Sequence, residues 1–139
     1  MNVSVDSGAI RRYAVGDVAA ITLFVVLGEL SHGANPLTVF VPMLETLGTF
    51  LVGWFAAAVF AGAYSGRTLV NARQAILVPI FSWAIADAIA QLLRSTPWIS
   101  GSGAVSFYLV AFVVGGGLLG LWRFVGYRFA RKRSAFTGD

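Results

Sequence analysis

Cysteine is absent from the 139 residues, and histidine occurs only once, at His32. The lack of cysteine excludes a disulfide framework, a thiolate metal site and a cysteine nucleophile. A single histidine also excludes a multi-histidine metal site within one chain. We therefore expect the protein to hold neither a resident metal ion nor another cofactor.

Charge is scarce as well, because Asp, Glu, Lys and Arg together make up 12% of the residues while 58% are hydrophobic. An average soluble domain carries about 25% charged residues, so lipid must cover much of this surface. The net charge of +4 comes mostly from arginines near the ends of apolar runs. That placement indicates contact with anionic lipid headgroups and not with nucleic acid.

What the sequence does contain is four long apolar runs, each close to the length of a membrane span. About 20 apolar residues, each rising about 1.5 Å, cross the hydrocarbon core of a bilayer. The runs lack the polar stripe of a soluble amphipathic helix, and no segment alternates as barrel strands do. We therefore predict an all-α polytopic membrane protein, a bundle of four transmembrane helices. The expected spans are residues 13–31, 42–64, 74–93 and 104–122.

Turn-forming residues separate these runs and set the expected organisation. Asn35-Pro36 ends the first run, and the segments 65–73 and 94–103 have the composition of loops. We expect a frayed N-terminal tail at residues 1–12, a transmembrane domain at 13–122 and a basic tail at 123–139 that extends the last helix. The first run is too long for a signal-peptide core and no cleavage site follows it, which favours an uncleaved anchor.

The distribution of lysine and arginine predicts the orientation in the cell membrane. Nine of these residues lie in the two tails and the second loop, whereas the opposite side holds only Arg94. Positive charge accumulates on the cytoplasmic side of membrane proteins, so we expect both termini to be cytoplasmic. The nine are Arg11, Arg12, Arg67, Arg73, Arg123, Arg128, Arg131, Lys132 and Arg133.

Acidic residues inside or beside apolar runs are the candidates for a site. Asp17 lies about 6 Å inside the cytoplasmic end of the first span, and we expect Arg123 or Arg128 to neutralise it. A carboxylate facing lipid is costly, so such groups should face the bundle, form a pair or be protonated. The outer-side candidates for binding or transport are Asp87, Glu29, Glu45, His32, Gln91 and Arg94.

Spacing places some of these outer candidates on common helix faces. Glu29 and His32 are three residues apart, while Asp87, Gln91 and Arg94 are separated by four and three. We expect Asp87 to point inward and to contact Gln91 or a polar residue of another span. One interpretation is a proton or cation pathway; the other is a structural network in which Arg94 neutralises Asp87 or Glu29.

Small residues recur every four positions in the third and fourth spans, at Ser82, Ala86 and Ala90 and at Gly116 and Gly120. Such stripes allow helix backbones to approach closely. We favour packing within the bundle, with a homodimer or a partner membrane protein as the open alternative. The run 115–117, three glycines, suggests either helix bending or close approach to a ligand.

Several short motifs resemble a known family. They are Gly16-Asp17, the segment 28–33 (GELSHG), Glu45-Thr46, the segment 50–54 (FLVGW) and Leu93-Arg94. Together they are similar to a family of small four-span membrane proteins, domain of unknown function 3054, of the archaeal type. The resemblance implies the four-span fold and brings no activity with it.

Enzyme chemistry is not expected, because the sequence has no nucleophile-base-acid set, no phosphate loop and no metal-ligand spacing. We therefore expect a structural or accessory membrane subunit with an outer-side polar cluster. The alternative is a small transporter or a proton- or cation-conducting protein that uses the intramembrane carboxylates.

Overall fold

The computed structural model describes residues 6–35, 37–99, 101 and 104–137. Pro36, Ser102 and Gly103, which we expected in loops, lie outside the described residues, as do the two chain ends. In the described part every regular element is a helix, which confirms the all-α fold. The helices are α1 (Ser7–Ser31), α2 (Phe40–Phe60), α3 (Gly66–Val70), α4 (Ala72–Arg94) and α5 (Val105–Thr137).

The four long helices are each long and apolar enough to cross a membrane. They contain 25, 21, 23 and 33 residues, and about 20 residues are needed to span a bilayer. Each expected span corresponds to one of these helices. The chain is therefore an all-α, multi-pass membrane protein.

Some helix boundaries differ from the expected ones because polar side chains cap the helices early. The backbone N–H of Gly8 donates to the Asp6 carboxylate at 3.0 Å, so α1 begins at Ser7 and residues 7–12 are helical instead of frayed. Asn71 accepts from the N–H groups of Arg73 and Gln74 and begins α4 at Ala72. Part of the expected basic loop forms the short helix α3.

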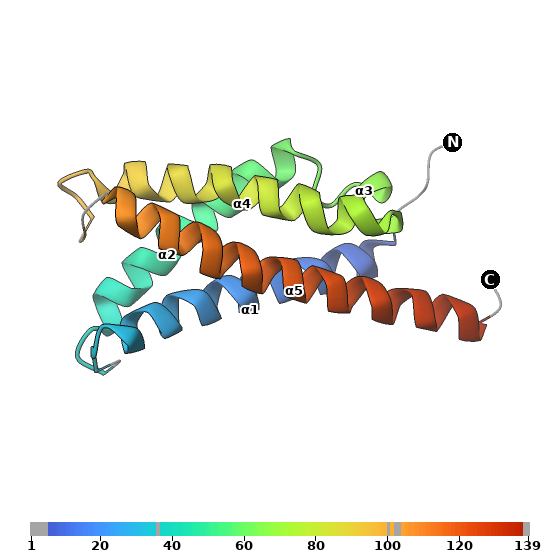
Figure 1. Cartoon of the computed structure of the whole chain (residues 1–139), viewed down its shortest axis with the longest axis horizontal. Helices are drawn as coiled ribbons and strands as arrows, with labels where there is room; N and C mark the ends of the chain where they lie inside the picture. The colour runs from blue at the N-terminus through green and yellow to red at the C-terminus, as the bar shows by residue number, and fades with distance from the viewer. Residues whose placement is uncertain (1–5, 36, 100, 102–103, 138–139) are drawn as a thin grey trace.

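The long helices form a closed ring in which α1 packs on α2, α2 on α4, α4 on α5 and α5 on α1. Figure 1 shows the α1–α2 and α4–α5 connections at one end of the bundle, while α1 begins and α5 finishes at the other. Helix α5 runs without interruption to Thr137 and extends past the rest of the bundle, as we expected for the basic tail.

Close helix contacts depend on glycine. A Cβ atom at Gly53 of α2 would lie 2.5 Å from the backbone oxygen of Ala86 on α4, and one at Gly115 would overlap the Trp83 ring. Gly115 thus makes room for a tryptophan of its own chain. The small-residue stripes of α4 and α5 are likewise buried within the single chain, which confirms their intramolecular packing.

Candidate functional site: two polar clusters separated by an aromatic layer

The first cluster, the inner cluster, centres on an ion pair between Asp17 of α1 and Arg123 of α5. Arg123 Nε donates to Asp17 Oδ1 at 2.8 Å, and Nη2 donates to Oδ2 at 2.6 Å. Both side chains are fully buried. The remaining guanidinium nitrogen, Nη1, donates to the carbonyl oxygen of Ala63 at 3.0 Å. Bidentate geometry of this kind fixes the angle and the register of the two helices.

Two aromatic residues complete the inner cluster. Trp54 Nε1 donates to the Tyr64 hydroxyl at 3.0 Å, and that hydroxyl donates to Asp17 Oδ2 at 2.7 Å. The Arg123 guanidinium also lies about 5 Å from the ring centres of Tyr13 and Tyr64. The carboxylate therefore accepts three hydrogen bonds from side chains of α5 and of the segment after α2.

The inner cluster confirms the expected pairing of Asp17 with Arg123. Arg128, the other expected partner, is exposed and lies over the Phe124 ring instead. Tyr64 and Trp54 were not among the partners expected for Asp17. Tyr64 carried a signal, since it closes the second apolar run at the expected cytoplasmic end, near the expected depth of Asp17. Trp54 lies in the middle of that run and carried none.

The second cluster, the outer cluster, includes Asp87 and Gln91 on α4. Gln91 Nε2 donates to Asp87 Oδ1 at 3.1 Å, and the two side chains are 0% and 9% exposed. This confirms that Asp87 points into the bundle and contacts Gln91. Asp87 Oδ2 and Gln91 Oε1 are buried and have no hydrogen-bond partner among the described residues.

Arg94 occupies the end of the same helix face, and its hydrogen bond and its ring contact are both to uncharged side chains. Its Nη1 donates to Thr46 Oγ1 at 2.6 Å, and its guanidinium lies 5.0 Å from the centre of the Phe107 ring. Within the described residues, Asp87 and Glu29 are both beyond ion-pair distance of Arg94. The structure therefore contradicts a pairing of Arg94 with Asp87, because the α2–α4 packing presents the Thr46 hydroxyl at that point. Arg94 and Glu29 line the same cavity and attract each other electrostatically without a direct ion pair.

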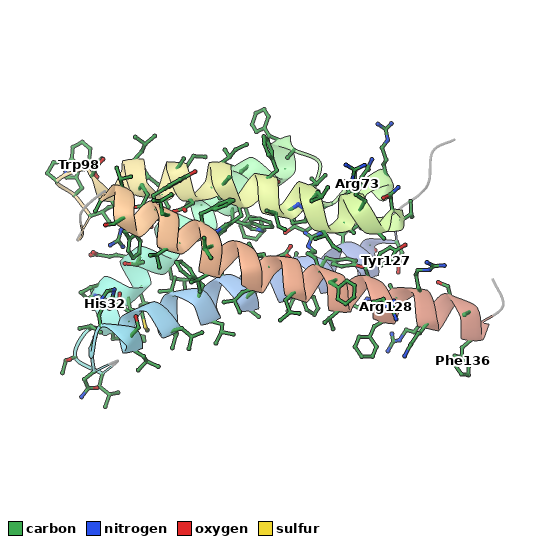
Figure 2. The ribbon with its side chains drawn as sticks, viewed as in Figure 1. His32, Arg73, Trp98, Tyr127, Arg128 and Phe136 are labelled. Atoms are coloured by element: carbon green, nitrogen blue, oxygen red, sulfur yellow. The ribbon has the colours of Figure 1, made fainter. Side chains whose placement is uncertain are left out.

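A small cavity of about 170 Å³ lies at this outer end and brings Glu29, His32, Thr46 and Arg94 together. Glu29 is half-buried and His32 is exposed. Glu45, Asp87 and Gln91 are not part of the cavity wall. Figure 2 shows His32 and Trp98 at this end of the bundle and Arg73, Tyr127 and Arg128 toward the opposite end. The other wall residues are Phe24, Val25, Gly28 and Phe107.

An aromatic layer, formed by Phe24, Phe50 and Trp83, separates the two clusters. The ring centres lie between 5.2 and 5.6 Å apart, and none of the three side chains is more than 5% exposed. Along α2, the residues Thr46, Phe50 and Trp54 follow at intervals of four. Thr46 accepts a hydrogen bond from Arg94, on the helix face that carries the outer cluster, and Trp54 belongs to the inner cluster, so the layer lies between them.

In the described part of the chain, no three histidine or acidic side chains are arranged to hold a metal ion. Four apolar helices around buried polar clusters define the class as a multi-pass, helical integral membrane protein. The sequence profile of a family described as "Protein of unknown function (DUF3054)" matches residues 14–126, and the chain belongs to that family. No curated protein and no solved structure matches the chain.

Proposed function

We propose that the protein is a structural or accessory membrane subunit of the cell membrane, with both termini in the cytoplasm. The observation that carries this proposal is the aromatic layer, which interrupts the bundle between its two polar clusters. A proton or cation path requires a continuous series of polar groups or waters across the membrane. The Phe50 ring has no polar group, and the indole N–H of the stacked Trp83 already donates to the Ala111 carbonyl oxygen at 2.9 Å.

The inner cluster also supports a structural role. Asp17 and Arg123 form two hydrogen bonds with each other, and their other side-chain hydrogen bonds are to Tyr64 and to the Ala63 carbonyl oxygen. Buried ion pairs specify one arrangement of helices more than they add net stability. The pair joins the first and last spans, and this role requires no catalytic chemistry.

A subunit of this kind needs a partner, and the bundle limits where that partner binds. The small-residue faces of α4 and α5 are occupied by contacts within one chain. A second copy or another membrane protein would therefore pack against other parts of the lipid-facing surface. The nine-to-one excess of basic residues supports the orientation, with the outer cluster on the external side.

The second candidate function is proton or cation conduction, and the outer cluster is the observation that favours it. Asp87 Oδ2 and Gln91 Oε1 are buried acceptors without a partner among the described residues. Unpaired buried acceptors are uncommon because each loses its hydration without compensation. A mobile proton or cation at Asp87 would satisfy them.

Ion flux into liposomes separates the two functions. We expect proteoliposomes with the wild-type protein to conduct protons, Na⁺ and K⁺ no faster than empty liposomes. Asp87→Asn keeps the shape of the side chain and should leave the thermal stability in detergent nearly unchanged. Arg94→Ala removes the hydrogen bond to Thr46 and should lower the thermal stability. Flux through the wild type that Asp87→Asn abolishes would overturn the structural role in favour of conduction.

A further inference from the structure

A groove of about 500 Å³ lies between α1 and α5 at the end of the bundle where α1 begins. The first turns of α1 and the last turns of α5 diverge there (Figure 1). It adjoins the inner cluster through Tyr13, whose ring centre lies 5.0 Å from the Arg123 guanidinium, and it shares no lining residue with the outer cavity. The lining residues are Ala9, Arg12, Tyr13, Trp122, Gly126, Phe129, Ala130, Arg133 and Ser134.

The charge of the groove suits an anion. Its described lining contains two arginines, Arg12 and Arg133, and no acidic residue. Arg12 has an acidic neighbour outside the lining, because its Nη2 lies 3.9 Å from Asp6 Oδ2. Both of those side chains are more than half exposed, so the pair is loose and leaves Arg12 able to bind another oxyanion.

Tyr13 provides a second, independent observation that favours ligand binding in the groove. Its side chain is 5% exposed and lines the groove, yet its hydroxyl has no hydrogen-bond partner among the described residues. A buried hydroxyl without a partner loses its hydration, so a ligand oxygen at this position would be favoured. Tyr13 also borders a neighbouring hollow of about 830 Å³, but that hollow includes Asp6 and is less suited to an anion.

Apart from Ser134, the remaining walls are apolar, and Tyr13 and Trp122 lie at the expected ends of the first and fourth spans. Trp122 and Phe129 provide aromatic surface, and Gly126 leaves space that a side chain would fill against the Tyr13 ring. Tyrosine and tryptophan concentrate where the headgroups meet the hydrocarbon. A free phosphate would use only the charged part of such a groove, whereas a phospholipid would use both parts.

We propose that this groove binds one anionic phospholipid. Arg12, Arg133 and the Tyr13 hydroxyl donate to the phosphate, and the upper part of an acyl chain lies against Trp122. Such binding would attach α5 to α1 through a lipid where the two helices diverge. The site does not depend on whether the protein is a structural subunit or a conductor.

Quenching of tryptophan fluorescence by brominated lipid tests the site. In a Trp98→Phe background the remaining tryptophans are Trp122 and the fully buried Trp54 and Trp83. The protein is placed in phosphatidylcholine vesicles that contain a minor fraction of either brominated phosphatidylglycerol or brominated phosphatidylcholine. We expect stronger quenching by the brominated phosphatidylglycerol, which gives a relative association constant for the anionic lipid.

Matched variants distinguish this groove from general surface charge. Arg12→Gln should lower the relative association constant about fivefold, the effect of one arginine near an anionic surface. Tyr13→Phe should also lower the relative association constant, although this substitution leaves the charge unchanged. Arg73→Gln removes the same charge from an exposed position outside the groove and should have little effect.

Three results would overturn the proposal. The first is equal quenching by the two lipids, and the second is a loss in Arg73→Gln as large as that in Arg12→Gln. The third is displacement of the lipid by inorganic phosphate at physiological concentration, which would make the groove a site for a free anion.

Discussion

The ion pair between Asp17 and Arg123 is the strongest constraint that single residues place on this bundle. A charge at the centre of a membrane helix costs about 2.5 to 3.5 kcal/mol on insertion scales, so neither partner is stable there alone. The two side chains are fully buried and joined by two hydrogen bonds. Each therefore depends on the other for its position.

We predict that Asp17→Asn lowers the free energy of unfolding by about 3 to 5 kcal/mol, because it leaves the Arg123 charge buried and uncompensated. Tyr64→Phe removes one hydrogen bond to the same carboxylate and should cost about 1 to 2 kcal/mol. Unfolding with SDS in mixed micelles, followed by tryptophan fluorescence, gives both values. A double variant, Asp17→Asn with Arg123→Met, should recover most of the loss; no recovery would contradict this explanation.

At the scale of the elements, helix packing depends on where glycine allows two backbones to meet. Gly53 of α2 faces the Ala86 carbonyl of α4 so closely that a methyl group cannot be added without moving a helix. Gly117 of α5 has nothing within 4 Å of the position of an added Cβ atom. The two glycines therefore provide a matched pair.

We predict that Gly53→Ala destabilises the protein by about 1 to 3 kcal/mol, the usual cost of overpacking. Gly117→Ala should be neutral or stabilising by up to about 1 kcal/mol, since alanine is the better helix former. The same SDS unfolding experiment measures both changes. Equal effects of the two substitutions would show that helix propensity, and not the α2–α4 contact, determines the result.

The sequence was sufficient to predict the helices but not all of their ends. Apolar runs of membrane length identify the four long helices, because lipid imposes one length and one polarity on every span. The start of α1 at Ser7 depends on a local hydrogen bond from Gly8 to Asp6, which an apolar pattern does not reveal. The same holds for Asn71 at the start of α4.

The candidate site was predictable only where the possible partners were few. For Asp17, only two cationic side chains were expected at a similar depth in the membrane. One of them, Arg123, forms the ion pair. Arg94 was different, because its hydrogen-bond partner is the neutral Thr46, whose position depends on how α2 packs on α4. Glu29, one of its two expected partners, attracts it without a direct ion pair. The aromatic layer was also outside the reach of sequence reasoning, since apolar periodicity does not show which rings from three helices meet.

For the whole molecule, the surroundings of both hollows depend on which end of the bundle faces the cytoplasm. The cavity with Glu29 and His32 and the groove with Arg12 lie at opposite ends, so inverting the protein would exchange their surroundings. From the excess of basic residues we expect the groove and the extension of α5 to lie on the cytoplasmic side. Trp98 and Phe136 mark the two ends and are 87% and 95% exposed.

Labelling of single cysteines in intact cells tests this orientation most directly, because the natural chain has no cysteine to interfere. A maleimide that does not cross membranes should label Trp98→Cys from outside the cell. It should label Phe136→Cys only after the membrane is permeabilised. Labelling of Phe136→Cys alone from outside would show an inverted protein, and labelling of both positions from outside would contradict the arrangement of four spans.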